Sequence, residues 1–340
     1  MTVRIVMIAV AVASLLLTYG LRRYALARSL MDVPNARSSH SVPTPRGGGV
    51  AIVVSFLVAL PVLAVMDVLP WAAAWTLQGA GALVALVGFW DDHGHIPARW
   101  RLLAHFSGAA WALVWLGGAP PLDLFGTTFD LGWLGAGFAA VYLVWLLNLY
   151  NFMDGIDGIA SIEAVCVCVG GAILYALIGK PSLAVVPLLL AAAVAGFLYW
   201  NFPPARIFMG DAGSGFLGIV LGILSLQAGW VAPELFWCWV ILLGVFVTDA
   251  TFTLIRRLLR GDKVYEAHRS HAYQYASRLF GRHLPVTLAV AAINVVWLLP
   301  IALWVGIGGL DGVTGVAMAY VPLVALAARF RAGALESAEG

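Results

Sequence analysis

The sequence predicts an all-α, polytopic integral membrane protein, and its composition and apolar runs support this fold class. Of the 340 residues, 62% are hydrophobic and only 11% are charged, whereas soluble domains average about 45–50% apolar and about 25% charged residues. A spanning helix needs about 20 predominantly apolar residues, and runs of roughly that length recur along the whole chain. We therefore expect a single transmembrane domain over residues 1–331 and a short disordered tail over residues 332–340.

The first predicted span covers residues 3–21 and is expected to be a retained anchor with its N-terminus outside. A cleaved signal peptide is the alternative, but Arg22 and Arg23 follow the apolar run directly and Arg4 alone precedes it. This order of charges favours a segment that stays in the membrane as an anchor over one that is cleaved off. The ten further predicted spans are 48–67, 71–90, 102–118, 133–149, 159–178, 182–199, 212–230, 234–254, 284–304 and 312–328. The chain is therefore expected to cross the membrane about eleven times.

The distribution of Lys and Arg predicts the orientation. With the N-terminus outside, every one of the 19 basic residues except Arg4 and Lys180 lies in a segment that faces the cytoplasm, as the positive-inside rule requires. These segments are 22–47, 91–101, 150–158, 200–211, 255–283 and 329–340. They also hold the clustered aspartates, so we expect any chemistry on the cytoplasmic face, and the C-terminus there as well.

The polar stretch that follows the span at 133–149 carries the densest chemical signal. Its polar side chains recur every three residues, which keeps them near one helical face; they are Asn148, Asn151, Asp154 and Asp157. Carboxylates and amides at the end of a membrane helix are costly to desolvate, and such hard oxygen ligands suit Mg²⁺ and phosphates. A helix terminus with Asp-Gly turns is the alternative.

Two adjacent carboxylates, Asp91 and Asp92, end the span at 71–90, and Arg99 and Arg101 follow them. Adjacent carboxylates repel each other unless a cation, a proton or a basic group offsets their charge. This arrangement fits metal and phosphate chemistry, and a hairpin tip solvated by water is the alternative.

The first inside segment interleaves polar and charged residues with three prolines; the former include Asp32, Arg37, His40 and Arg46. Because arginine binds phosphates in bidentate fashion, Arg37 and Arg46 are candidate phosphate ligands. The alternative is a basic loop at the lipid surface.

The inside segment at 200–211 ends at Asp211, and Gly213 and Ser214 follow where the next span begins. A helix N-terminus with free N–H groups attracts anions, and Asp211 would then hold a metal that the anion shares. Asp211 as a simple N-cap is the alternative.

The segment at 255–283 contains a polar cluster made of His268, Arg269, His271, Tyr273 and Gln274. His271 is a candidate for phosphate binding or proton transfer. A basic amphipathic segment that lies on anionic lipid is the alternative.

In this order, the motifs resemble the polyprenyl-phosphate N-acetylhexosamine-1-phosphate transferases, which include the WecA and MraY groups. The resemblance runs from Asp32 to about Arg278 and is carried by Asp91-Asp92, the Asn-Asp stretch and Phe-Met-Gly-Asp211. It implies that a UDP-N-acetylhexosamine donates its sugar-1-phosphate to undecaprenyl phosphate in the inner leaflet of the bacterial inner membrane, and that UMP leaves. Eleven spans with the N-terminus outside resemble the WecA side.

The resemblance also implies roles for individual residues. Asn151 and Asp211 match Mg²⁺ ligands, with Mn²⁺ as an alternative ion, and Arg101 matches a position that contacts the donor diphosphate. The implied catalytic set, at the lipid phosphate and the nucleotide, is Asp91, Asp92, Asp154, Asp157 and His271. The implied substrate-binding set is Arg37, His40, Arg101, Asn148 and Arg269.

The stretch from His268 to Gln274 departs from the histidine-rich run of many relatives, because only His271 is kept. It resembles the subgroup that initiates O-antigen and lipopolysaccharide synthesis. That subgroup implies a donor such as UDP-N-acetylfucosamine or UDP-N-acetylquinovosamine, with UDP-N-acetylglucosamine as an alternative. The sequence contains no nucleic-acid-binding motif, and it leaves the oligomeric state open.

Two other functions are compatible with parts of the pattern. A transporter would also carry carboxylates and Gly-interrupted helices, but no internal repeat is detectable and the carboxylates cluster at the cytoplasmic ends of the predicted spans. A CDP-alcohol phosphotransferase shares paired Asp-Gly motifs, yet its longer Asp-Gly-x-x-Ala-Arg pattern is absent from the sequence.

Overall fold

The computed structural model describes residues 2–34, 39–94, 96–262 and 268–335. It confirms an all-α protein with many apolar helices. The helices are α1 Val3–Ala27, α2 Val50–Val65, α3 Trp71–His93, α4 Ala98–Leu116, α5 Gly132–Met153, α6 Ile159–Leu177, the short η1 Pro181–Ala184, α7 Val185–Asn201, α8 Asp211–Val231, α9 Pro233–Leu242, α10 Gly244–Leu259, α11 Ala272–Phe280, α12 Leu284–Ala292, the π-helical η2 Ile293–Leu298, α13 Leu299–Gly306 and α14 Gly312–Arg329. Two small antiparallel pairs complete the fold, β1 Met31–Asp32 with β2 Thr44–Pro45, and β3 Leu122–Leu124 with β4 Thr127–Phe129.

The helices account for the apolar runs of the sequence. In the described part of the chain, eight helical segments are long and apolar enough to cross a membrane, and the pair α9 and α10 would make a ninth. The remaining predicted spans coincide with α4 and with the shorter α2. All eleven runs are therefore helical, while the number that cross the bilayer stays a prediction.

The predicted span at 234–254 is not one continuous helix, which corrects the expectation. α9 and α10 are bent by 73° at Leu243, where φ of −80° and ψ of 5° interrupt the helical backbone. Gly244 follows, and a Cβ there would lie 3.0 Å from the ring of Tyr320. The missing side chain lets this corner pack closely against α14.

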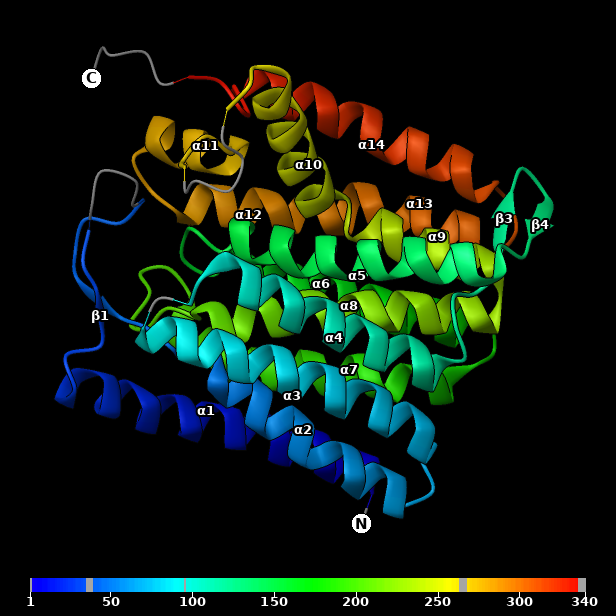
Figure 1. Ribbon diagram of the computed structural model, residues 1–340, viewed down its shortest axis with the longest axis horizontal. Helices are drawn as coiled ribbons and strands as arrows, with labels where there is room; N and C mark the ends of the chain where they lie inside the picture. The colour runs from blue at the N-terminus through cyan, green and yellow to red at the C-terminus, as the bar shows by residue number, and fades with distance from the viewer. Residues whose placement is uncertain (1, 35–38, 95, 263–267, 336–340) are drawn as a thin grey trace.

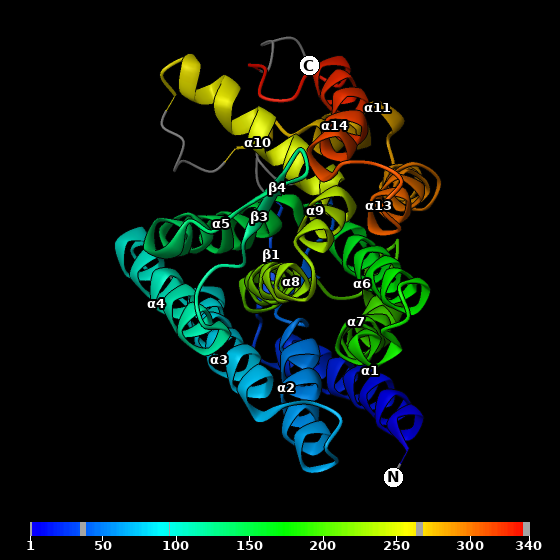
Figure 2. The ribbon, with the colours of Figure 1, turned by 90° about the vertical axis from the view of Figure 1, so that its right-hand side faces the viewer.

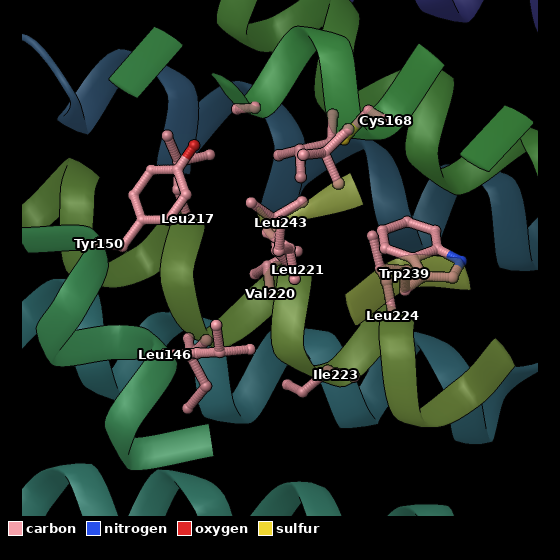
Figure 3. Close-up of a cluster of buried hydrophobic side chains, with 14 of the residues drawn as sticks. Leu146, Tyr150, Cys168, Leu217, Val220, Leu221, Ile223, Leu224, Trp239 and Leu243 are labelled. Atoms are coloured by element: carbon pink, nitrogen blue, oxygen red, sulfur yellow. The ribbon is translucent and has the colours of Figure 1, made fainter. Parts of the chain in front are cut away.

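Helix α8 is the centre of the bundle. Its most apolar window is 83% buried, against 22% for α1, and Figure 2 shows α8 end-on with the other helices around it. α3, α5 and α9 pack directly against it. In Figure 3, Leu217, Val220, Leu221 and Leu224 of α8 lie among side chains of α5 and α9, with the fully buried Trp239 at one side.

The two ends of the bundle differ in character. The β3–β4 hairpin lies at one end, and β1 and α11 lie at the other (Figure 1). The second end also carries the starts of α6 and α8 and is called the polar end below. Residues 332–335 of the predicted tail are described, and the Gly333 N–H donates to the Ser270 carbonyl at 2.7 Å; residues 336–340 lie outside the described residues.

Candidate active site

A polar cavity of about 380 Å³ opens at the polar end, beside the start of α8. Several of the predicted site residues line it, namely His40, Asp92, Asn151, Asp154, Asp157 and Asp211. They come from four of the inside segments that the sequence singles out. The fold therefore brings together residues that are up to 171 positions apart in the chain, from His40 to Asp211.

Asp92 joins the end of α3 to the start of α8. Its carboxylate accepts the backbone N–H groups of Asp211 at 3.1 Å and of Ala212 at 3.3 Å. Gly210 precedes them with φ of +78°, and a Cβ at this position would lie 2.7 Å from the carboxylate. The N-terminus of α8 is thus capped by Asp92, and Asp211 is its first helical residue and not its N-cap.

A glycine on α3 sets the distance between α3 and α8. A Cβ at Gly88 would lie 2.6 Å from the backbone of Asp211, so any larger residue would push the two helices apart. The Arg46 guanidinium donates to the Asp92 carbonyl from the other side. Asp211 is therefore held at the cavity by backbone contacts that do not use its own carboxylate.

Asp91 makes different contacts from Asp92, although the two are adjacent. It forms an ion pair with Arg101 and accepts the N–H of Ile96 at 2.8 Å. Arg101 also lies 3.8 Å from the Asp211 carboxylate. Because the guanidinium offsets the charge of Asp91, the pair supplies the basic group that adjacent carboxylates require.

The two asparagines of α5 donate hydrogen bonds to different helices, Asn151 to α8 and Asn148 to its own helix. The Asn151 amide donates to the Ser214 hydroxyl at 3.1 Å, and that hydroxyl donates to the Gly210 carbonyl at 3.2 Å. The Asn148 amide donates to the Val144 carbonyl at 2.7 Å. The amide oxygen of each asparagine is not used in these bonds.

Asp154 lies between α5 and α6 and is the least compensated carboxylate of the cavity. Burial raises the pKa of Asp154 well above the ordinary range, and the negative charges of Asp211 and Asp92 raise it further. Its carboxylate makes no hydrogen bond within residues 2–34, 39–94, 96–262 and 268–335. A cation at this point would offset the repulsion among these groups.

The residues present fit a hard divalent cation. Carboxylates of Asp211 and Asp154 and the amide oxygen of Asn151 are the donor types that Mg²⁺ prefers, and Mg²⁺ keeps several water ligands instead of demanding a full protein cage. Among the described residues, no group of three or more His, Cys, Asp or Glu side chains is arranged to hold a metal by itself.

Asp157 lines the polar cavity and also holds three segments together. Its carboxylate accepts the Ala205 N–H at 2.9 Å and pairs with His283 Nδ1 at 3.0 Å. His283 Nε2 donates to the Ser39 carbonyl at 3.0 Å. Burial alone would lower the pKa of His283, but the hydrogen bond and charge of Asp157 raise it above its ordinary value. The backbone N–H of Asp157 also points at His283 Nδ1, at 3.4 Å, so both the main chain and the carboxylate of Asp157 contact this ring nitrogen.

His271 is buried at the start of α11 and does not line the polar cavity. Its Nδ1 lies 3.4 Å from Asp249 of α10. The same carboxylate accepts the N–H groups of Ala272 at 2.9 Å and Tyr273 at 3.0 Å. Asp249 therefore caps α11, and sequence reasoning missed it although it is the only acidic residue between Pro233 and Arg260 besides Glu234.

The other predicted residues of the loops have mixed placements. His40 lines the cavity, with its ring edge-on against Phe208 at 4.9 Å. The Arg269 carbonyl accepts from Arg278 at 3.2 Å, and Arg37 lies outside the described residues. His268, which was not in the predicted sets, does line the cavity. Burial lowers its pKa to about 3, assisted by the charge of His271.

A second, larger cavity of about 550 Å³ adjoins the first. The two share Ser39, His40, Asp157, Phe208 and His283. The second cavity is otherwise lined by residues of the segments 41–44 and 203–205, by the end of α11 and by the turn into α12, and this lining includes Arg278 and Arg282. The site as a whole is thus acidic at the start of α8 and basic toward the loops.

Comparisons with known proteins identify the family of the chain. Residues 74–229 match the sequence profile described as glycosyl transferase family 4. A phospho-N-acetylmuramoyl-pentapeptide-transferase of Moorella thermoacetica is 33% identical over 236 residues, which cover 64% of this chain and 73% of the relative. The chain belongs to glycosyl transferase family 4.

Two further members of the family match over more of the chain. A probable undecaprenyl-phosphate N-acetylglucosaminyl 1-phosphate transferase of Bacillus subtilis is 29% identical over 267 residues, covering 76% of this chain and 73% of the relative. A decaprenyl-phosphate N-acetylglucosaminephosphotransferase of Mycobacterium leprae is 26% identical over 309 residues, which cover 81% of this chain and 74% of the relative. This glycosyl transferase family 4 member is thus a multi-pass membrane phosphotransferase of the polyprenyl-phosphate hexosamine-1-phosphate type.

Proposed function

We propose that the protein transfers N-acetylhexosamine-1-phosphate from a UDP-sugar to undecaprenyl phosphate on the cytoplasmic side of the bacterial inner membrane, and that it acts as a single membrane domain. The product would be the first lipid-linked intermediate of O-antigen or another cell-envelope polysaccharide, with UMP as the second product. The observation that carries the proposal is the convergence of Asp154, Asn151 and Asp211 in one cavity at the end of an apolar bundle. Soluble nucleotide and membrane-embedded lipid phosphate can meet only at such a boundary.

Asn151 and Asp211 are proposed to hold Mg²⁺, with Asp154 beside them and Mn²⁺ as an alternative ion. A divalent cation at this position offsets the negative charge of a diphosphate. Asp211 suits the task because Asp92 and the close contact at Gly88 fix its backbone. Asn151 suits the task because its amide nitrogen donates to the Ser214 hydroxyl, which leaves the amide oxygen available as a metal ligand.

The two adjoining cavities fit an elongated donor. The diphosphate would lie at the acidic end, where Arg46 also lines the wall, and the uridine or sugar would extend toward the second cavity. His40 is at the junction of the two cavities, consistent with its predicted role in substrate binding. His268 lines the acidic end with a pKa held near 3, so it offers a neutral hydrogen-bonding ring there.

The lipid phosphate is proposed to attack the donor directly. A phosphate monoester has a second pKa near about 6, so it is already an anion at neutral pH. One of its oxygens forms a bond to the β-phosphorus, and the bond from that phosphorus to the bridging oxygen of UMP breaks. Positioning and charge compensation supply most of the catalysis in such transfers.

The contacts of the other carboxylates favour direct attack over an aspartyl intermediate. Asp92 caps α8, Asp91 is paired with Arg101, and each is therefore proposed to position the centre. Asp157 is proposed to hold the loops through His283, and His271 to order α11 beside the cavity. Asp154 alone is left to contact a reacting phosphate. Arg101, 3.8 Å from Asp211, would add positive charge near the diphosphate; Asn148 and Arg269 remain predicted substrate contacts.

Release of UMP tests the proposal. The purified protein would be assayed in detergent with undecaprenyl phosphate, Mg²⁺ and a panel of UDP-N-acetylglucosamine, -galactosamine, -fucosamine and -quinovosamine. We expect release that requires both lipid and Mg²⁺ and is lost in Asp211→Asn. Preference for N-acetylfucosamine or N-acetylquinovosamine would support a 6-deoxy donor, whereas preference for UDP-N-acetylglucosamine would refute the 6-deoxy assignment. Release of UMP without lipid, or a trapped sugar-phosphate adduct on an aspartate, would refute direct attack.

A further inference from the structure

Another polar cavity, much smaller than the donor site, also reaches Asp211 and lies where α3, α4, α5 and α8 meet. Its volume is about 20 Å³, and its polar wall is formed by Asp91, Arg101, His105, Asn148, Asn151 and Asp211. A cavity needs roughly 10–15 Å³ of this kind of space to hold one water molecule. Asn151 and Asp211 line both this cavity and the larger polar one, so they form the wall between the two.

His105 is the one member of this wall that the chemistry described above does not use. It lies one helical turn after Arg101 on α4, so both side chains face the same way. The residue is 8% exposed, and its Nδ1 is buried without a hydrogen-bond partner among the described residues. A buried polar atom of this kind normally has a partner, often an ordered water.

The spacing of the charged groups also leaves room for a water. Arg101 lies 3.8 Å from the Asp211 carboxylate, which is too long for a direct hydrogen bond, so a water that contacts both groups is compatible with the spacing. The Asn148 amide nitrogen is occupied by Val144, which leaves its oxygen as an acceptor. Genuinely empty cavities are apolar, and this one has charged and amide groups on its walls.

We propose that one water molecule resides in this cavity, bound by His105 Nδ1, and that it orients the Asp211 carboxylate toward the cation. His105 is then a positioning residue that acts on the reaction through the water. The inference rests on the proposed function, because it assigns His105 a role toward the metal ligand Asp211. Groups that orient metal ligands typically change metal affinity by roughly 10–100-fold when they are removed.

Mn²⁺ binding to the substrate-free protein tests the inference without an activity readout. Free Mn²⁺ would be measured by electron paramagnetic resonance in wild type, His105→Leu, His105→Gln and Asp211→Asn, with Thr76→Val as the matched control. Thr76 is a buried polar residue of α3 that bonds within its own helix to Ala72. We expect the Kd of His105→Leu to rise about tenfold, His105→Gln to stay within about threefold of wild type, and Thr76→Val to be unchanged.

The outcomes separate this inference from the proposed function. If wild type binds Mn²⁺ and Asp211→Asn does not, but His105→Leu binds as wild type does, the role of His105 is refuted and the proposed metal site stands. If Asp211→Asn binds Mn²⁺ like wild type, the proposed metal ligand itself is wrong. Should His105→Leu fail to fold, a crystal structure of the wild type decides: density for one water within hydrogen-bonding distance of Nδ1 supports the inference, and an empty cavity overturns it.

Discussion

Replacing Asp249 by alanine should loosen the start of α11 without unfolding the bundle. The carboxylate accepts the N–H groups of Ala272 and Tyr273 at 2.9 and 3.0 Å, and hydrogen bonds to a charged group each contribute about 1.5–3 kcal/mol. Because other groups and water compensate in part, we expect the local free energy of opening to fall by about 3 kcal/mol. Since about 1.4 kcal/mol corresponds to a factor of ten, amide exchange there should accelerate roughly 100-fold.

Hydrogen exchange read by mass spectrometry on peptides that cover residues 272–280 measures this effect directly. Asp249→Asn keeps one acceptor oxygen and should accelerate exchange about tenfold. Thr253→Val is the control, because it removes only the hydroxyl that bonds the same carboxylate at 3.2 Å. Unchanged exchange in Asp249→Ala, or an equal acceleration in α6 and α8, would show that the carboxylate does not cap α11 as the contacts indicate.

Three further predictions concern the cavity. Gly210→Ala should reduce UMP release at least tenfold, because its backbone has φ of +78° and the new Cβ would meet the Asp92 carboxylate; unchanged activity would contradict the role of this contact. The raised pKa of His283 means that the folded state holds its proton more tightly than the unfolded state does. The stabilisation from the Asp157 pair is therefore full below about pH 6.5 and is lost as pH rises through the raised pKa. Melting temperatures measured between about pH 5 and 9 should therefore fall with rising pH in wild type and stay flatter in His283→Gln. Chelation of divalent cations should abolish UMP release, and Mg²⁺ or Mn²⁺ should restore it; activity in excess chelator would refute the metal assignment.

The membrane class and the chemical end of the molecule could be predicted from the sequence because both depend on local signals. A run of about 20 apolar residues predicts a membrane helix wherever it occurs in the chain. The polar residues that begin at Asn148 stand out because they end such a run. Asn151, Asp154 and Asp211 do meet in one cavity, as their shared position at the ends of apolar runs that are predicted to face the same side suggests.

The contacts between distant segments could not be predicted in the same way. Asp92 and the N–H of Asp211 are 119 residues apart, and Asp157 and His283 are 126 apart; nothing in the composition of either partner indicates the other. The bend at Leu243 was hidden because apolar residues continue on both sides of it. Asp249 lies within the predicted span 234–254, and a single carboxylate in an apolar run does not by itself indicate a helix cap.

The position of Asp211 at the first turn of α8 has a consequence for how members of this architecture can diverge. Among the eight described segments that are long and apolar enough to cross a membrane, α8 is the most buried, so the residue at its N-terminus is anchored to the core. The second cavity, by contrast, is walled in large part by connecting segments such as 39–44 and 203–205, which tolerate insertion and substitution far better than a core does. If the donor binds as proposed, its diphosphate lies against the part of the protein that is hardest to alter, and its other end lies against segments that can change at little cost to the core. Selectivity for that end of the donor would then diverge while the centre stays the same.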